Sequence, residues 1–228
     1  MQTVFAIGAI VLGYIIGSIP SGLLIVKLKT GRDIRQVESG RTGGTNAMRA
    51  AGFGAGLLTA IADILKGAVA VWLAQAIAPQ ADWVHMLAAV GAILGHNYSI
   101  FLPERDENGR LIRLRGGAGG APTVGGALGL WAPSFLVIFT IGALTFFTLG
   151  IASIVTMSVA VSAIIVFAIR AYLGLAPWVD VWYGVIALAL LVWALRPNIK
   201  KLFAGNERVV QYSLYGVIRE RRKHTQPK

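Results

Sequence analysis

The sequence predicts an all-α integral membrane protein with seven transmembrane helices, its N-terminus outside the cell and its C-terminus in the cytoplasm. Three observations support this fold class. Hydrophobic residues make up 56% of the 228 residues and charged residues 14%, whereas a soluble domain usually carries about a quarter charged residues. The apolar residues form long unbroken runs, which is typical of chains that cross lipid. Lysine and arginine cluster between those runs.

Five apolar stretches are candidates to enter a bilayer. The first carries no charged residue and is long enough to cross a hydrocarbon core of about 30 Å. It lacks the basic start and small-residue cleavage site of a signal peptide, so we expect it to remain as the first span. The second is interrupted by Asp63 and Lys66. The stretches are 4–26, 55–78, 84–102, the uncharged region between Arg115 and Arg170, and 181–195.

The distribution of positive charge predicts which loops face the cytoplasm. Segments 27–53, 103–115 and 196–228 together hold 19 of the 21 lysines and arginines. Basic residues accumulate in loops that are not translocated, so all three segments are expected on the cytoplasmic side. The short links near 79–82 and 170–180 must then be external.

This sidedness also predicts the number of spans. The 54 residues between Arg115 and Arg170 carry no ionisable side chain, and they must cross the membrane an odd number of times. Three crossings of about 18 residues each fit this length, with breaks at Pro133 and Gly150. The total is seven helices, of which one of the middle helices is expected to be short.

Composition also argues against several classes of function. The net charge of +11 has its simplest explanation in the cytoplasmic loops, so no nucleic-acid partner is expected. The chain has no cysteine, which excludes disulfides, thiol catalysis and cysteine-ligated metals. Its three histidines are scattered along the chain, and no metal site is expected.

The first polar cluster begins at the inner end of the first span and continues to Arg49. It contains Gly-Ser-Ile-Pro-Ser-Gly at 17–22 and Ser-Gly-Arg-Thr-Gly-Gly-Thr-Asn at 39–46. Small residues with free backbone N–H groups, hydroxyls and arginine are the groups that bind a phosphate. The alternative is a flexible basic loop at the lipid headgroups.

Two further clusters follow. Asp63 and Lys66 are three residues apart and therefore share a helical face, and His96 and Asn97 close the third span. Ionisable residues inside a span usually mark a functional site, although a purely structural ion pair between helices is the alternative. The glycine-rich string at 116–126 is a second candidate anion nest, or a site of close helix packing.

The order of these motifs resembles the bacterial membrane-embedded glycerol-3-phosphate acyltransferase family, PlsY, which uses acyl phosphate as donor. The resemblance runs from about residue 17 to residue 207 in collinear order. It is carried by Gly-Ser-Ile-Pro at 17–20, Asp-Ile-Arg at 33–35, Ser-Gly-x-x-Gly-x-Thr-Asn-x-x-Arg at 39–49, Asp-x-x-Lys-Gly at 63–67, Gly-His-Asn at 95–97, Asn-Ile-Lys at 198–200 and Gly-x-Glu at 205–207.

This resemblance implies the transfer of a fatty acyl group from acyl phosphate to the 1-hydroxyl of sn-glycerol 3-phosphate, giving lysophosphatidate and phosphate for phospholipid biosynthesis. It implies a multi-pass protein of the bacterial inner membrane with a cytoplasmic active site and no metal or nucleotide cofactor. The expected partners are the two substrates and the lipid bilayer. The chain would then consist of a seven-helix acyltransferase-like domain, 1–207, and a basic cytoplasmic tail, 208–228.

The resemblance also implies roles for individual residues. Ser39, Arg49 and Asn198 would hold the glycerol phosphate, with His96 and Asn97 also in the catalytic set. Residues 43–46 would cradle the acyl-phosphate head, with its tail between helices. The substrate-binding set is Arg41, Gly43, Gly44, Thr45, Asn46, Asp63, Lys66, Arg115, Gly116, Gly117, Gly119 and Glu207.

Several positions depart from the family pattern. Ala118 replaces a phosphate-binding lysine, and Leu195 stands three residues before Asn198 where the family has histidine. Elsewhere Glu38 replaces a glycine, Arg41 an asparagine, and Phe146-Phe147 a Thr-Arg pair, and a charged insert occupies 103–113. At least two groups expected on the acceptor phosphate are therefore missing, and Arg41, Arg113 or Arg115 are candidates to compensate for them.

Three functional hypotheses follow from the sequence. The first is an acyltransferase of this type with altered phosphate contacts. The second is a non-catalytic paralogue that binds an anionic lipid headgroup or acyl phosphate. The third is a small anion carrier, suggested by Asp63, Lys66 and His96, although no inverted repeat is detectable in the sequence.

Overall fold

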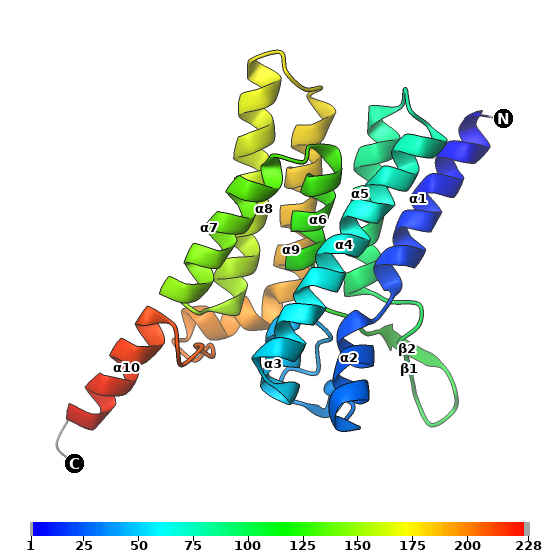
Figure 1. The fold of residues 1–228 in the computed structure, drawn as a ribbon. Helices are drawn as coiled ribbons and strands as arrows, with labels where there is room; N and C mark the ends of the chain where they lie inside the picture. Colours follow the sequence, from blue (N-terminus) through cyan, green and yellow to red (C-terminus); the bar gives the residue numbers. More distant parts are fainter. Residues whose placement is uncertain (1, 226–228) are drawn as a thin grey trace.

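The computed structural model describes residues 2–225 and is mainly helical (Figure 1). Most helices form a bundle, and shorter elements gather at one of its ends. In chain order the elements are α1 (Gln2–Ser18), α2 (Ser21–Thr30), η1 (Ile34–Gln36), α3 (Gly44–Ala51), α4 (Phe53–Ile77), α5 (Asp82–Asn97), β1 (Pro103–Arg105), β2 (Leu111–Leu114), α6 (Gly120–Leu130), α7 (Ser134–Thr148), α8 (Ala152–Tyr172), α9 (Val179–Phe203) and α10 (Leu214–Thr225).

The first apolar run is broken into two helices rather than forming one. Pro20 lacks a backbone N–H and clashes with the preceding turn, so α1 ends at Ser18 and α2 begins at Ser21. The break frees carbonyl groups that need partners in a membrane. Lys66 Nζ donates to Ile19 O at 2.9 Å, and Ser99 Oγ donates to Ser18 O at 2.5 Å. The polar groups of distant elements therefore stabilise the break.

The uncharged region between Arg115 and Arg170 forms three helices, as predicted. The helical structure is interrupted between α6 and α7 next to Pro133. It is interrupted again between α7 and α8 at Gly150, where φ is +66°. The predicted short middle helix is α6, with 11 residues, or about 16 Å of rise. This is much shorter than a hydrocarbon core of about 30 Å.

Four helices in the described part of the chain are long and apolar enough to cross a membrane. The first is the segment Gln2–Thr30, which includes α1, the break at Pro20 and α2. The others are Phe53–Ile77, Ala152–Tyr172 and Val179–Phe203. Their outer faces carry large apolar side chains such as Leu58 and Ile165, and Leu136 on α7 is 69% exposed. A surface of this kind is typical of a protein whose solvent is lipid.

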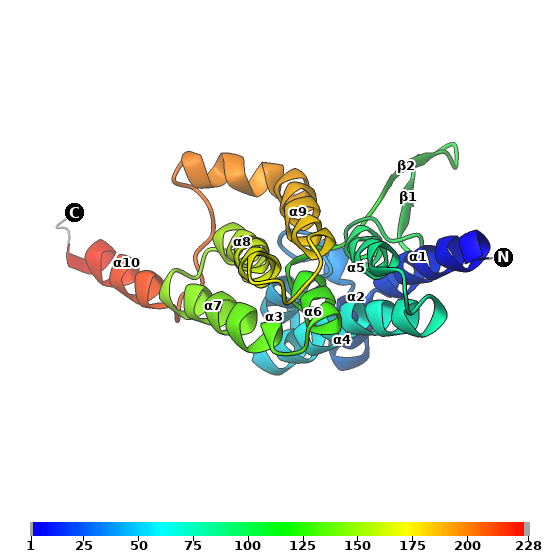
Figure 2. The same ribbon diagram turned by 90° about the horizontal axis from the view of Figure 1, so that it is seen from above.

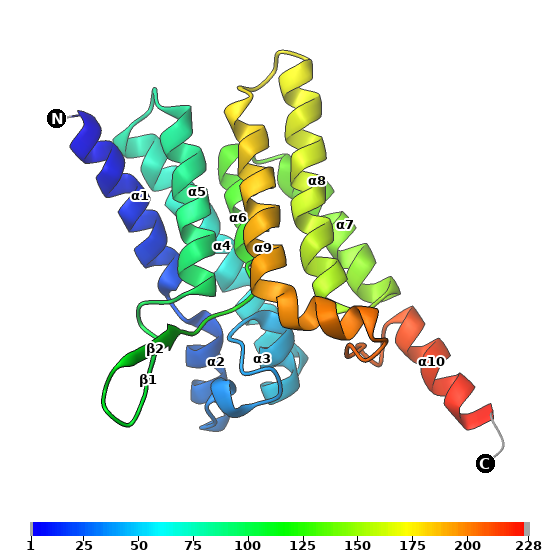
Figure 3. The same ribbon diagram turned by 180° about the vertical axis from the view of Figure 1, so that it is seen from behind.

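The shorter elements and the basic segments share one end of the bundle. Figures 1 and 3 show α2, α3 and the β1–β2 hairpin there, together with α10 and the end of α9. The N-terminus and the α4–α5 and α8–α9 links lie at the opposite end. The last part of α9 turns away from the bundle (Figure 3), and Pro197 inside this helix is the physical cause of the bend.

The charged insert at 103–113 belongs to an antiparallel hairpin. Pro103 pairs with Leu114 and Glu104 with Arg113. Apart from an isolated bridge between Ile151 and Val209, this hairpin is the only β-structure among residues 2–225. The all-α prediction therefore holds for the bundle and missed this extension.

Helix α6 packs at the centre of the bundle. Seen from above (Figure 2), it lies between α4 on one side and α8 and α9 on the other, and it contacts α4, α5 and α8. Small residues allow this close approach, because a Cβ on Gly67 of α4 would come within 2.5 Å of Pro122 O. Tyr183 of α9 is fully buried and donates its hydroxyl to Thr123 O at 2.6 Å.

Helices α1 and α5 also pack through glycine. A Cβ on Gly17 would come within 2.5 Å of Ala92 Cα, and one on Gly95 within 2.7 Å of Ser18 N. Neither helix can therefore carry a side chain at these positions without moving apart. By contrast, a Cβ on Gly8 in the same helix α1 would meet nothing within 4 Å.

We therefore expect Gly17→Ala to destabilise the protein by about 1–3 kcal/mol, because the added methyl group overpacks the α1–α5 contact. Gly8→Ala is the matched control and should leave stability unchanged or slightly raised, since alanine favours the helix by up to about 1 kcal/mol. Thermal unfolding in detergent measures both. Equal effects of the two substitutions would contradict the close contact.

Candidate active site

A cavity of about 340 Å³ lies among the elements at the basic end and extends between α4, α7 and α8. It is lined by polar groups toward the loops and by apolar side chains between the helices. The predicted site residues that line it are Ser39, Arg41, Gly43, Gly44, Thr45, Asn46, Arg49, Asp63, His96, Gly119 and Asn198. Residues separated by up to 159 positions in the sequence thus meet in one space.

The loop between η1 and α3 forms one wall and is held by Asn46. The Asn46 Nδ2 atom lies 3.2 Å from Ile34 O, 3.0 Å from Val37 O and 2.8 Å from Arg41 O. The amide has two N–H groups, so one of them is shared between two of these three carbonyls, and a single buried side chain on α3 holds η1 and the loop together. Asn46 was predicted to cradle the acyl-phosphate head, and these bonds show that its side-chain nitrogen fixes the loop.

The same loop contains a residue in an unusual backbone conformation. Glu38 has a φ of +52°, a left-handed value that favours glycine, which is the residue expected there from the family pattern. Its carboxylate forms an ion pair with Arg208 of the tail. The segment that precedes Ser39 is thereby tied to the C-terminal part of the chain.

A buried polar cluster joins α4 to α5. Asp63 Oδ1 lies 2.9 Å from Lys66 Nζ and 3.5 Å from His96 Nδ1, and the side chains of Asp63 and Lys66 are 1% and 6% exposed. Because Lys66 also donates to Ile19 O, the cluster reaches the break between α1 and α2. Asp63 and His96 line the cavity, whereas Lys66, which pairs with Asp63, does not.

The first glycines of the glycine-rich string pack against His96. Gly117 N donates to His96 O at 2.8 Å, and Thr42 N donates to Gly116 O at 3.2 Å. A Cβ on Gly117 would come within 2.6 Å of His96 Cε1, so a larger residue would displace the ring. Gly116 and Gly117 therefore support close packing, which was the alternative to an anion nest.

The later glycines of the string open helix α6 toward the cavity. Gly119 adopts a left-handed φ of +90° as the N-cap, and Ala118, Gly119, Gly120 and Ala121 all line the cavity. A helix N-terminus presents free N–H groups and partial positive charge, which favours an anion. Ala118 itself adds no charge to this wall.

Two arginines contribute positive charge to the polar wall. Arg49 extends from α3, and Arg41 extends from the loop before it. Burial lowers the pKa of both guanidinium groups, and the charge of Glu207 opposes this effect in each case. Both remain charged at neutral pH, because a guanidinium group does not lose its proton in proteins.

Asn198 is oriented by a carboxylate that does not line the cavity. Its Nδ2 donates to Glu207 Oε1 at 3.1 Å, and the same oxygen accepts from Ser153 N at 3.3 Å. Ser153 Oγ donates to the other carboxylate oxygen. Glu207 thus connects the end of α9 to the start of α8, and its geometry indicates a positioning role.

The apolar half of the cavity was not predicted residue by residue. It is formed by α4, α7 and α8, with Leu57, Phe139 and Phe147 among its lining residues. These three side chains are 47%, 44% and 52% exposed, so this half opens toward the outer face of the bundle. Thr156 of α8 also lines the cavity, next to Gly120. It carries no sequence signal, because it lies within an uncharged run.

Six of the predicted site residues, all within the described part of the chain, do not line the cavity. They are Lys66, Asn97, Arg115, Gly116, Gly117 and Glu207. The Asn97 side chain is buried without a hydrogen-bond partner and lies close to Gly119. Direct contact of these six residues with a substrate remains a prediction.

Comparisons with known proteins agree on one family. The sequence profile of the glycerol-3-phosphate acyltransferase family matches residues 7–205. Glycerol-3-phosphate acyltransferases of Thermus thermophilus and Deinococcus radiodurans are 37% and 38% identical, over 89% and 91% of this chain and 94% and 96% of their own. The crystal structure of PlsY, an integral membrane glycerol 3-phosphate acyltransferase, in its glycerol 3-phosphate form is 28% identical. It superimposes with a TM-score of 0.76, covering 90% of this chain and 95% of that one.

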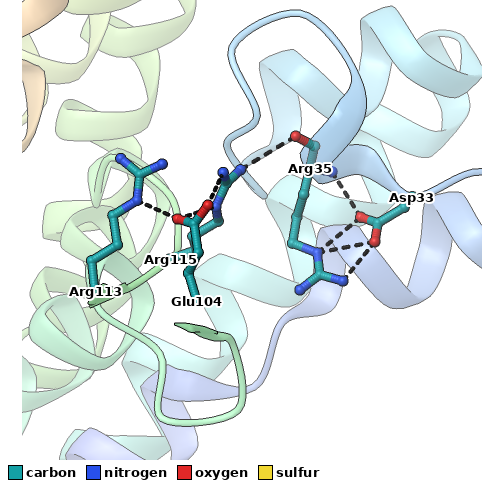
Figure 4. Close-up of polar contacts among 5 residues, drawn as sticks. All are labelled: Asp33, Arg35, Glu104, Arg113 and Arg115. Carbon is teal, nitrogen blue, oxygen red and sulfur yellow. Dashed lines mark hydrogen bonds and ion pairs between the residues drawn. The ribbon is translucent and has the colours of Figure 1, made fainter. Parts of the chain in front are cut away.

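Ion pairs and one hydrogen bond connect the hairpin to η1, which precedes the loop of the cavity wall (Figure 4). Arg115 donates to both carboxylate oxygens of Glu104, at 2.9 and 2.7 Å, and Arg113 donates to one of them. Arg115 Nη1 also donates to Arg35 O at 3.4 Å, and Arg35 pairs with Asp33 at 2.6 Å. Hydrogen bonds from Arg115 and Arg113 lower the pKa of Glu104 to about 2.

Because the pKa of Glu104 is lower in the folded protein, its contribution to stability is present above the ordinary value of 4.5 and is lost as the pH falls toward about 2. We expect hydrogen-exchange protection of the hairpin amides, corrected for intrinsic rates, to hold from pH 7 to 5 and fall below that. Glu104→Gln should lower protection at neutral pH and remove this pH dependence. Glu107→Gln in the hairpin turn is the control, and identical profiles for both variants would contradict the network.

Proposed function

The chain belongs to the glycerol-3-phosphate acyltransferase family, and from that premise we propose that it transfers a fatty acyl group from acyl phosphate to the 1-hydroxyl of sn-glycerol 3-phosphate. The products are lysophosphatidate and phosphate, and the reaction serves phospholipid biosynthesis. The reaction uses no metal ion or nucleotide cofactor.

The observation that carries this proposal is the two-sided character of the cavity. Its polar wall holds Arg41, Arg49 and the N-terminus of α6, which suit the phosphate groups of both substrates. Its apolar half lies between helices and opens to the outer face. An acyl phosphate combines an anionic head with a long apolar tail, so it matches both halves at once.

The family resemblance and the cavity together support specific roles. Ser39, Arg49 and Asn198 hold the glycerol phosphate, and residues 43–46 cradle the donor phosphate. Asp63 and His96 fix the wall between them. These roles come from the family resemblance, and the shared position of the residues around one cavity supports them.

The chemistry requires positioning and charge stabilisation more than acid–base groups of the protein. The substrate hydroxyl oxygen attacks the acyl carbonyl carbon, forming an ester bond, while the bond from that carbon to the phosphate oxygen breaks. The departing phosphate accepts the hydroxyl proton, so atoms and charge balance without a covalent enzyme intermediate. The arginines and the α6 N-terminus stabilise the negative charge that develops on the carbonyl and phosphate oxygens.

We also propose the topology that brings the cavity to the cytoplasm. Seven helices, namely α1 and α4 to α9, pass through the bacterial inner membrane, with the N-terminus outside and the C-terminus inside. Helix α6 is too short to cover the hydrocarbon core by itself, and it lies within the bundle against α4, α5 and α8. The gathering of the basic segments at one end supports this orientation. Exposed Trp83, Trp178 and Trp182 near the external α4–α5 and α8–α9 links suit a membrane interface.

A non-catalytic paralogue that binds an anionic headgroup is the second candidate, favoured by one observation. Ala118 and Leu195 both line the cavity and carry no charge. An inactive wild-type protein that gains turnover when Ala118→Lys and Leu195→His are combined would favour this candidate.

We predict that Arg49→Ala lowers the formation of lysophosphatidate by at least about 100-fold, because a preorganised charged donor is lost from the cavity. Arg49→Lys keeps the charge without the bidentate geometry and should be intermediate. Arg32→Ala is the control, since Arg32 is an exposed arginine of the same segment outside the cavity. The assay supplies acyl phosphate and labelled glycerol 3-phosphate to the purified protein in lipid.

Equal activity of Arg49→Ala and Arg32→Ala would remove Arg49 from the active site. If folded wild-type protein forms no product under conditions in which a Thermus thermophilus relative does, the proposed reaction is wrong.

A further inference from the structure

Arg41 has a buried charged group that the protein does not fully satisfy. Its Nη2 atom donates to Ala194 O on α9 at 2.5 Å, while its Nη1 atom is buried and has no hydrogen-bond partner. An unmade hydrogen bond on a buried charged donor is costly, and arginine cannot avoid this cost by losing its proton. Arg41 is one of the residues that line the cavity, so a ligand in the cavity can supply the missing acceptor.

The position of this guanidinium is fixed by the surrounding backbone. Asn46 Nδ2 donates to Arg41 O at 2.8 Å, and the next residue, Thr42, donates its N–H to Gly116 O at 3.2 Å. With Ala194 O holding one nitrogen on the α9 side, the free nitrogen is held in place before any ligand binds. Preorganisation of this kind is typical of a binding contact rather than of a solvated surface charge.

The carboxylate of Glu207 does not neutralise Arg41 by direct contact. Glu207 already accepts from Ser153 and Asn198. The bond to Ala194 O brings the Arg41 side chain to α9, one turn before Asn198. Arg41, Asn198 and the uncharged Leu195 all line the cavity.

The other two candidate compensating arginines are engaged elsewhere. Arg113 is 62% exposed and pairs with Glu104, and Arg115 contacts Glu104 and Arg35 O. Neither lines the cavity. Arg41 and Arg49 are the lysine or arginine residues that do so in the described part of the chain.

We propose that Arg41 is a specificity-determining contact for the acceptor: its free Nη1 binds the phosphate group of glycerol 3-phosphate beside Asn198, and it supplies the charge that Ala118 and Leu195 do not. The inference rests on the proposed function, because it assigns a residue to one of the two substrates of that reaction. Arg49 alone does not then account for recognition of the acceptor phosphate.

The test compares Arg41→Ala and Arg41→Gln with the wild-type protein. The loss of a charged hydrogen bond should raise KM for glycerol 3-phosphate by about 10- to 100-fold in both variants, with little change in KM for acyl phosphate. Glutamine retains a donor for Ala194 O but no charge, so it keeps the proposal testable if the alanine variant unfolds. Arg113→Ala is the matched control and should leave both KM values unchanged.

A second variant separates binding from structural support. Ala118→Lys introduced into Arg41→Gln restores a cation to the same cavity, and it should recover at least part of the lost affinity for glycerol 3-phosphate. A purely structural tie between the loop and α9 would not be rescued in this way. Absence of rescue, an unchanged KM for glycerol 3-phosphate, or a rise confined to the KM for acyl phosphate would each overturn the proposal.

Titration calorimetry with inorganic phosphate provides a readout that does not depend on turnover. Wild-type protein should bind phosphate about 10- to 100-fold more tightly than Arg41→Gln, and Arg113→Ala should match the wild type. If the wild-type protein forms no lysophosphatidate but this difference is found, the proposed reaction fails and the phosphate contact stands. If turnover is normal and phosphate binding is the same in all variants, Arg41 does not bind phosphate.

Discussion

The contact of Lys66 with Asp63 and with the carbonyl of Ile19 is the interaction on which the arrangement of the site depends. A buried ion pair is costly to desolvate, and removal of one partner would leave an uncompensated buried charge. Here the ammonium stabilises the break at Pro20, and the carboxylate faces His96 on α5. The ends of α1 and α5 therefore contact the middle of α4 at one place. The loops that line the cavity pack beside this contact.

The cavity depends on this point through a chain of backbone contacts. His96 O accepts from Gly117 N, and Gly116 O accepts from Thr42 N in the loop that carries Arg41. Glycine is required along this path because a Cβ on Gly117 would overlap the His96 ring. The buried polar cluster of α4 and α5 thereby helps to place the positive groups of the loops. We propose that catalysis depends on those loop charges and on the N-terminus of α6.

Much of the fold could be predicted from the sequence, because its signals are local. The breaks near Pro133 and Gly150 follow from backbone chemistry, and the shared end of the basic segments follows from charge. The division of the first apolar run at Pro20 was missed, because Lys66 and Ser99, which stabilise it, are distant in the sequence. The site was predicted as a set of motifs, but the orientation of Asn198 by Glu207 and the exposure of Thr156 to the cavity depend on tertiary packing.

We propose that one cavity brings an acyl phosphate and glycerol 3-phosphate together for direct acyl transfer. The most direct measurement uses purified wild-type protein in lipid vesicles, supplied with acyl phosphate and with or without glycerol 3-phosphate. We predict that lysophosphatidate and phosphate form in equal amounts, and that acyl phosphate is consumed only when glycerol 3-phosphate is present. Consumption of acyl phosphate to free fatty acid at the same rate without the acceptor, or no consumption by folded protein, would contradict this claim.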